Sequence, residues 1–322
     1  MTRAFRVAAL AGLAVLALAG TARAGSDLAV EQRARAARDT AERDPNCTAV
    51  QPFYWSVGDA SGLQAEGRVG LAAPGPHTRM PVASASKWLY GAYVVQKHGG
   101  TLSAADVAFL HFTSGYTEFS KCRPEQTVGG CDAWRRNDRH VAADDGRFFY
   151  GGGHMQRQAT LDGEAADDNA LLAAHVNALL GTSIAYTQPQ PAGGASTSAA
   201  DYGGFLRRVV AGELRMHDAL GAQAVCTNPA TCPTAVYTPM PQTESPHYAL
   251  GHWVEDDPVA GDGAFSSAGA FGFYPWIDRT ARWWGVLARV DLRHAGAEPG
   301  SGVRSLYCGR DIRAAWVSGR AR

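Results

Sequence analysis

Lysine is nearly absent from this chain. Among 322 residues only Lys87, Lys97 and Lys121 are lysines, so 27 of the 30 basic residues are arginines. Thirty acidic residues balance them, and the formal net charge is zero. Nucleic-acid-binding proteins depend on an excess of clustered Lys and Arg, so we expect no nucleic-acid partner. One of the few lysines, Lys87, follows two closely spaced serines, Ser84 and Ser86.

Sequence motifs for metals and cofactors are also lacking. There is no His-Glu-x-x-His of a zinc hydrolase, and the glycines at 151–153 lack the Gly-Lys-Ser/Thr ending of a phosphate-binding loop. No two cysteines have the two-residue spacing of a zinc site. We therefore expect neither a metal nor a cofactor.

Long apolar runs are missing except at the N-terminus. The apolar residues 7–19 follow Arg3 and Arg6 and precede Ala22-Arg23-Ala24. This order is typical of a secretory signal peptide cleaved after Ala24. The run is short for a membrane span, so we expect none in the mature chain. Removal of residues 1–24 leaves 27 basic and 30 acidic residues, and the sequence predicts a periplasmic or secreted protein.

The cysteine content agrees with export. Six cysteines can pair in fifteen ways, and an oxidising compartment favours disulfides over free thiols. Two short loops of polar sequence containing Gly or Pro suggest local bonds, which leaves one cysteine near each end of the chain. The predicted pairs are Cys122–Cys131, Cys226–Cys232 and Cys47–Cys308.

Hydrophobic periodicity predicts a mixed α/β (α+β) protein. Helical spacing marks residues 27–42, 85–96, 166–180, 199–212 and 301–317. Alternating or aromatic segments predict strands at 53–57, 67–71, 248–254, 270–277 and 282–290. Because the strands come from both ends, residues 25–100 and 245–322 are expected to form a discontinuous sheet domain. Residues 101–244 are expected to form a mostly helical domain.

Ser84 and Lys87 carry the first chemical signal. They lie three residues apart at the start of an apolar helical stretch, so their side chains share one helix face. Burial lowers the pKa of a lysine, and a neutral amine can take the proton of a serine hydroxyl. The free N–H groups at the helix start can hold an oxyanion. The alternative is a helix cap followed by a surface lysine.

Further segments share an order with a known family. Ser84-Ala85-Ser86-Lys87, together with residues 109–116, 146–152, 193–202 and 267–272, resembles the penicillin-binding-protein-like serine hydrolases. That superfamily includes class C β-lactamases, D-Ala-D-Ala carboxypeptidases and family VIII esterases. The resemblance covers about residues 26–320. It implies the β-lactamase/transpeptidase-like fold, an antiparallel sheet flanked by N- and C-terminal helices with a mostly helical domain.

The resemblance also implies roles for individual residues. Ser84 would be the nucleophile that forms an acyl-enzyme, and Lys87 and Tyr150 would share the proton transfers. The backbone N–H groups of Ser84 and Ala270 would form the oxyanion hole. Tyr150 could act as a base only if its pKa fell well below about 10, for which a Lys87 cation is the expected cause. The alternative for Tyr150 is an aromatic core residue.

Two departures from the family pattern bear on the substrate. At the three substrate-binding positions, Gly152 stands where the family has Asn, Ser267 replaces Lys or His, and Gly269 is kept. Ala268 further removes a hydroxyl, unless a register shift lets Ser266 serve. Without a cation, affinity for a substrate carboxylate should fall.

We therefore expect hydrolysis of an ester or amide bond in a small-molecule, peptide or oligomeric substrate. A D-Ala-D-Ala carboxypeptidase or β-lactamase is one alternative, and a catalytically impaired cell-wall- or glycan-binding protein of the same fold is another.

Overall fold

The computed structural model describes residues 29–322, so the predicted signal peptide, residues 1–24, lies outside the described residues. Helices cover residues 29–43, then α2 (Pro45–Thr48), α3 (Ser86–Lys97), α4 (Ala104–Leu110), α5 (Val128–Asp132), α6 (Gly153–Ala159), α7 (Asn169–Leu180), α8 (Ala199–Val210), α9 (Met216–Ala219) and α10 (Ser301–Ser318). Two short 3₁₀ helices are η1 (Ala83–Ala85) and η2 (Ala142–Asp144), and η3 (Thr160–Glu164) is a short π-helix.

The strands form one large and two small sheets. They are β1 (Phe53–Asp59), β2 (Gly62–Val69), β3 (Met80–Pro81), β4 (Phe148–Phe149), β5 (Ala185–Tyr186), β6 (Ala195–Thr197), β7 (Val225–Cys226), β8 (Ala235–Tyr237), β9 (His247–Ala249), β10 (His252–Glu255), β11 (Ala264–Ser266), β12 (Tyr274–Ile277) and β13 (Trp284–Ala288). The large sheet has the order β2-β1-β13-β12-β11-β10-β9-β7, and all its pairings are antiparallel. The predicted fold class is confirmed.

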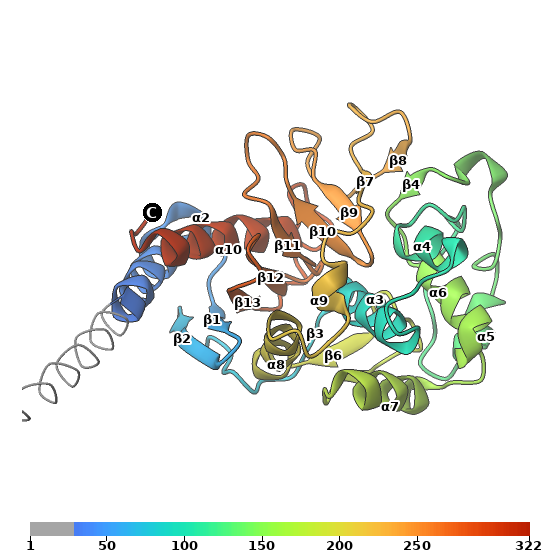
Figure 1. Ribbon diagram of the computed structural model, residues 1–322, viewed down its shortest axis with the longest axis horizontal. Coiled ribbons are helices and arrows are strands. Elements are labelled where there is room, and N and C mark those ends of the chain that lie inside the picture. Colours follow the sequence, from blue (N-terminus) through green and yellow to red (C-terminus); the bar gives the residue numbers. More distant parts are fainter. Residues whose placement is uncertain (1–28) are drawn as a thin grey trace, which may run out of the picture.

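Helices cover both faces of the large sheet. The ring of Tyr274 on β12 lies against Gly309 of α10, where an added Cβ would come within 2.3 Å of it. Ile277 points to the other face, and its cross-strand partner Trp284 lies against Gly203 of α8. Figure 1 shows α10 and the helix at 29–43 at one end of the molecule, and α4 to α7 at the other.

The three predicted cysteine pairs are present in the structure. Their S–S distances are 2.08 Å for Cys47–Cys308, 1.99 Å for Cys122–Cys131 and 1.91 Å for Cys226–Cys232. The first pair joins α2 to α10 and so ties the two ends of the chain together. Within residues 29–322, no helix combines the length and the apolar character needed to cross a membrane.

Two strand predictions need correction. Residues 248–254 form the two strands β9 and β10 rather than one, because the chain reverses at Gly251, whose φ is +80°. The reversal also brings Gly251 so close to Lys87 that an added Cβ would lie 2.6 Å from the Lys87 carbonyl oxygen. The strand expected at 270–277 begins only at Tyr274, because residues 267–273 form a loop against η1.

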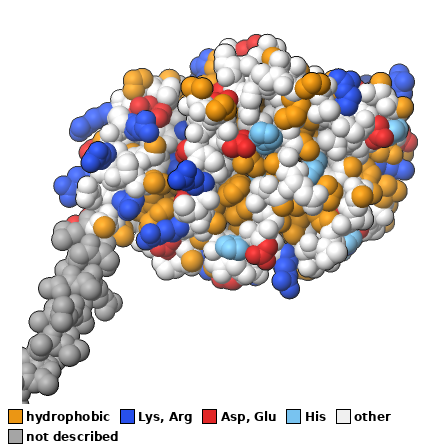
Figure 2. Space-filling model, turned by 45° about the horizontal axis from the view of Figure 1, so that its top comes forward, with side chains coloured by type: hydrophobic (Ala, Val, Ile, Leu, Met, Phe, Trp, Pro, Cys, Tyr) orange, Lys and Arg blue, Asp and Glu red, His pale blue; other side chains and the backbone are white. Residues whose placement is uncertain are grey.

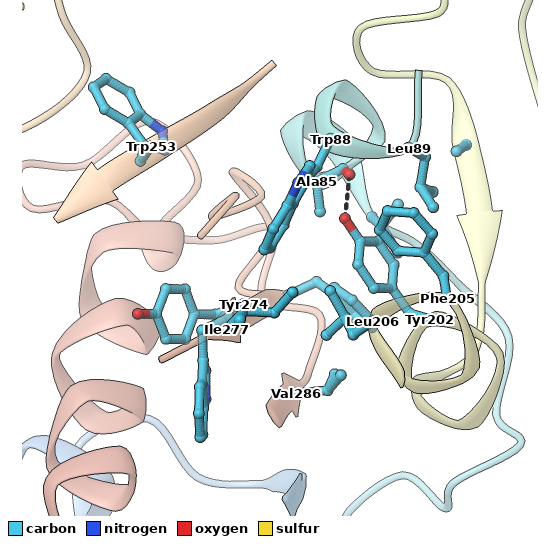
Figure 3. Close-up of a cluster of buried hydrophobic side chains, with 14 of the residues drawn as sticks. Ala85, Trp88, Leu89, Tyr202, Phe205, Leu206, Trp253, Tyr274, Ile277 and Val286 are labelled. Carbon is cyan, nitrogen blue, oxygen red and sulfur yellow. Dashed lines mark hydrogen bonds between the residues drawn. The ribbon is translucent and has the colours of Figure 1, made fainter. Parts of the chain in front are cut away.

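Helix α3 lies in the centre of the core. Its residues from Ser86 to Val95 are all buried. Trp88 stacks on His252 of β10, with ring centroids 5.3 Å apart, and the Tyr202 hydroxyl of α8 donates to the Ala85 carbonyl at 2.8 Å. Figure 3 shows the hydrogen bond between Tyr202 and Ala85, with Trp88 nearby, among the buried side chains. A polar side chain in the first turn of α3, such as that of Lys87, is therefore buried in an apolar environment.

The surface is not uniformly charged. On the face drawn in Figure 2, hydrophobic side chains gather along the middle, whereas Lys and Arg side chains stand mostly toward the ends. Leu71 and Val259 are almost fully exposed, at 96% and 95%.

A buried ionic network fastens α10 to the sheet. The Glu255 carboxylate of β10 is fully buried and accepts from Arg310 at 2.8 Å, Arg313 at 2.9 Å and the Tyr274 hydroxyl at 2.6 Å. Arg313 also binds Asp262 at 2.7 Å. Burial alone would raise the pKa of Glu255, but the charges of Arg313 and Arg310 outweigh it and hold this pKa at about 2.

Removal of one network partner should destabilise the protein strongly. Arg313→Ala leaves the buried Glu255 charge poorly compensated, so the free energy of unfolding should fall by about 3–5 kcal/mol. Urea denaturation measures this fall. The control is Arg293→Ala, because that side chain is 89% exposed and its pairing with Asp291 is worth about 0–1 kcal/mol. Equal effects of the two substitutions would contradict the assignment.

Candidate active site

Ser84 lies in η1, between the short strand β3 and α3. The residue before it, Ala83, has a φ of +45°, which is unfavourable for a residue with a Cβ. Ser86 holds this segment, because its hydroxyl donates to the Ala83 carbonyl at 2.6 Å and accepts from the Ala195 N–H at 3.1 Å. Ser84 itself is half-buried. The fold therefore fixes the backbone that presents the Ser84 hydroxyl.

Lys87 lies beneath the Ser84 hydroxyl. Its Nζ is 3.0 Å from Ser84 Oγ and 2.9 Å from the Ala192 carbonyl oxygen, and the side chain is buried. Nζ also lies 4.8 Å from the centroid of the Tyr150 ring. Burial lowers the pKa of Lys87 to about 7. At neutral pH a large fraction of the molecules therefore has Lys87 as a neutral amine, within hydrogen-bond distance of Ser84.

The Tyr150 ring lies against the Lys87 amine. Its ring stacks on Trp253 with centroids 5.2 Å apart, and its N–H donates to the Tyr237 carbonyl at 3.0 Å. Burial raises the pKa of Tyr150 to about 12, although hydrogen bonds with Ser84 and Trp253 oppose the shift. The expectation of a lowered Tyr150 pKa is therefore wrong, because burial of the phenol raises this pKa by more than its hydrogen bonds lower it. Tyr150 remains a protonated phenol at neutral pH.

His154 supports the backbone that leads into Tyr150. Its Nε2 lies 3.0 Å from the Phe149 carbonyl, and its Nδ1 lies 2.8 Å from the Ser114 hydroxyl. Burial lowers the pKa of His154 to about 3, so the ring is neutral. One nitrogen must then donate and the other accept. Donation from Nε2 to the carbonyl and acceptance at Nδ1 from Ser114 satisfy every atom, and His154 is a buried positioning residue.

The loop 267–273 contains the segment 267–272 of the family resemblance and lies against Ser84. The Ser267 hydroxyl donates to the Ser84 carbonyl at 3.0 Å. Gly269 packs so tightly that an added Cβ would lie 2.1 Å from the Val82 carbonyl oxygen. Ala270 follows in an exposed turn, and its N–H has no acceptor among residues 29–322. Ser267 therefore holds the segment that contains Ser84, and its hydroxyl is already engaged in that hydrogen bond.

The space at Gly152 is filled from elsewhere in the chain. An added Cβ there would lie 2.9 Å from the Phe119 ring and 3.3 Å from the Gln190 amide nitrogen. Sequence reasoning missed Phe119, Gln190 and the Ala192 carbonyl. The first two belong to loops without a recognisable motif. The Ala192 contact is made by a backbone carbonyl, which every residue has, so the residue type does not indicate it.

In the described part of the chain, no three His, Cys, Asp or Glu side chains are arranged to hold a metal ion. The arrangement can instead support nucleophilic catalysis, because a serine hydroxyl, a neutral amine and a protonated phenol meet at one place.

Solved structures share this fold. The chain is similar to a β-lactamase from Mycobacterium bovis (TM-score 0.55, 15% identity, covering 82% of this chain and 96% of that one). It is also similar to the octameric penicillin-binding protein homologue from Pyrococcus abyssi (0.58, 13%, 85% and 74%). A third similar structure is EstCE1, a hydrolase with promiscuous acyltransferase activity (0.55, 14%, 89% and 99%). No protein-family model and no curated protein sequence match the chain.

These similarities define the fold. It is that of β-lactamases and penicillin-binding-protein homologues, in agreement with the resemblance of the sequence motifs.

Buried neutral histidines should make the protein sensitive to acid. Burial lowers the pKa of His111 and His252 to about 4 and that of His154 to about 3, whereas unfolded histidine titrates near 6.5. Between these values the unfolded chain binds more protons, so stability falls as pH falls. We expect a loss of about 1–2 kcal/mol per histidine between pH 7 and pH 5, measured by urea denaturation.

One histidine offers a control for this effect. His111 Nε2 is buried without a hydrogen-bond partner in the described residues, so His111→Phe should reduce the pH dependence. A free energy of unfolding that is equal at pH 7 and pH 5 in the unsubstituted protein would rule out this explanation.

Proposed function

We propose that this protein is an exported serine hydrolase that cleaves an ester or amide bond through an acyl-Ser84 intermediate. The observation that carries the proposal is the 3.0 Å contact between Ser84 Oγ and Lys87 Nζ, whose pKa burial lowers to about 7. A general base works best when its pKa lies near the operating pH. The fold alone does not carry the proposal, because one fold hosts many functions.

In acylation, Ser84 Oγ attacks the substrate carbonyl carbon while its proton passes to the neutral Lys87 amine. The bond to the leaving group then breaks, and Tyr150, a phenol with a pKa of about 12, donates its proton to that group. Tyr150 recovers a proton from the Lys87 ammonium. In deacylation a water molecule gives its proton to Lys87 and attacks the ester carbonyl, and the released Ser84 oxygen takes the proton back.

Two backbone groups would stabilise the oxyanion that forms in each step. The Ser84 N–H lies in the first helical turn, where backbone donors lack helical acceptors. The Ala270 N–H also has no acceptor among the described residues, and its loop packs against Val82. Donors aimed at a developing negative charge contribute strongly to such reactions.

The substrate proposed here has no carboxylate next to the cleaved bond. Position 267 carries a hydroxyl instead of a cation, and this hydroxyl is bonded to the Ser84 carbonyl. A β-lactam or a free D-Ala-D-Ala end would find no counter-charge there. The three disulfides and the N-terminal sequence pattern support export to the periplasm or the medium.

An ester should therefore be a better substrate than a cephalosporin. We expect Ser84-dependent turnover of p-nitrophenyl acetate and little turnover of nitrocefin, both measured by absorbance. Ser84→Ala should abolish ester turnover, whereas Ser183→Ala, an exposed serine, should not change it. Faster turnover of nitrocefin than of the ester would favour the β-lactamase alternative, and no turnover of either would favour the binding protein.

The pH profile tests the role of Lys87. Because the neutral amine is the base, kcat/KM for the ester should rise with pH through about 7 and then level off. Lys87→Arg keeps the positive charge but cannot take up a proton, so kcat/KM should fall by about 10²–10⁴-fold.

Lys121→Arg provides the matched control, since Lys121 is exposed and should tolerate the change. If Lys87→Arg retained full activity, another group would have to be the base.

A further inference from the structure

We propose that Trp253 is a positioning residue whose indole N–H stabilises the Tyr150 phenolate when Tyr150 gives its proton to the leaving group. This inference rests on the proposed function, because it concerns the proton donor of the Ser84 site. Trp253 belongs to none of the segments that resemble the family, yet its ring lies directly against Tyr150.

Aromatic contacts fix the orientation of the Tyr150 ring. The centroids of Trp253 and Tyr150 are 5.2 Å apart with 21° between the planes, and Trp253 is 1% exposed. Tyr248 meets both rings edge-on, at 5.7 Å from Tyr150 and 4.9 Å from Trp253. Phe112 meets the Tyr150 ring edge-on from a further side, at 5.6 Å. Stacked and edge-on contacts of this kind hold the phenol in one orientation.

The sheet places Trp253 beside the position where the family has a cation. Trp253 of β10 is paired with Ser266 of β11. The next residue, Ser267, stands in place of Lys or His, and its hydroxyl donates to the Ser84 carbonyl. Position 267 therefore offers no positive charge to a phenolate at Tyr150. Because a poorly solvated charge is costly in an apolar environment, the phenolate needs a donor besides Lys87.

Trp253 is the neighbour that can supply this donor. Hydrogen bonds with Ser84 and Trp253 lower the pKa of Tyr150, although burial raises it by more. The N–H is the only hydrogen-bonding group of an indole, so Trp253 is the donor of its bond. Ser84 has no proton to donate once its oxygen is acylated. The Tyr248 hydroxyl is buried without a hydrogen-bond partner among residues 29–322, and Phe112 has no polar side-chain atom.

The indole N–H keeps its own proton throughout the reaction. As the bond to the leaving group breaks, the phenol proton of Tyr150 passes to the leaving atom, and the phenolate oxygen accepts from the Trp253 N–H. The phenolate then takes a proton from the Lys87 ammonium. A hydrogen bond to a charged group is stronger than one to a neutral group. Trp253 therefore favours the step in which the phenolate forms.

Two acetate esters with different leaving groups test the proposal. Ethoxide needs a proton in order to leave ethyl acetate, whereas p-nitrophenolate leaves p-nitrophenyl acetate without one. Trp253→Phe keeps an aromatic ring but removes the N–H. We expect kcat/KM to fall about tenfold for ethyl acetate, followed by pH-stat titration, and less than twofold for p-nitrophenyl acetate, followed by absorbance.

Matched variants separate the N–H from the packing of the ring. Trp253→His should recover part of the ethyl acetate rate relative to Trp253→Phe, because an imidazole carries a nitrogen at the ring position of indole Nε1. Trp316→Phe removes another fully buried indole N–H, which has no partner among the described residues, and should leave the ratio of the two rates unchanged. If Trp253→Phe does not fold, Trp253→Met takes its place with the same expectation, since methionine fills irregular space.

Equal losses on both esters, or no loss on either, would overturn the role of Trp253 while leaving the proposed function intact. Turnover of p-nitrophenyl acetate alone by the unsubstituted protein would also overturn it, because Tyr150 would then not assist the leaving group. Absence of Ser84-dependent turnover of both esters would instead overturn the proposed function, and this inference with it.

Discussion

The site depends on placing one lysine amine in an apolar environment. Lys87 Nζ lies between Ser84 Oγ and the Ala192 carbonyl, and the aromatic rings of Tyr150 and Phe112 cover it at 4.8 and 5.9 Å from their centroids. No carboxylate among residues 29–322 contacts it, so burial lowers its pKa without an opposing charge. Arginine could not serve here, because a guanidinium does not lose its proton near neutral pH. Although the chain has only three lysines, position 87 is one where arginine could not replace lysine.

Much of the remaining structure serves to keep that amine buried. Helix α3 is enclosed by α8 and by the β9–β10 hairpin, and the hairpin approaches it closely because Gly251 has no side chain. Gly269 allows a similar approach of the loop 267–273 to Val82. The network around Glu255 and Arg313 fixes α10 against the sheet to which this hairpin belongs.

The sequence predicted the elements with a strong local pattern. The apolar period of α3, the aromatic strands and the Ser-x-x-Lys spacing are local properties, and the end-to-end disulfide followed from elimination among six cysteines. The strands predicted at 248–254 and 270–277 were wrong because tertiary contacts decide the conformation at Gly251 and in the loop after Ser266. The expectation of a lowered Tyr150 pKa failed for a related reason, because only the folded chain shows how completely the Tyr150 phenol is buried. Gln190 lay beyond prediction because only the folded chain places it beside Gly152.

The central claim is that Ser84 is a nucleophile activated by its neighbour. Mass spectrometry after incubation with a fluorophosphonate probe tests this claim most directly, because the phosphonylated residue can be mapped without knowledge of the natural substrate. We expect one adduct per chain, on the peptide that contains Ser84, and none in Lys87→Arg under the same conditions. An unlabelled protein at any probe concentration, or an adduct on a different serine, would contradict the account.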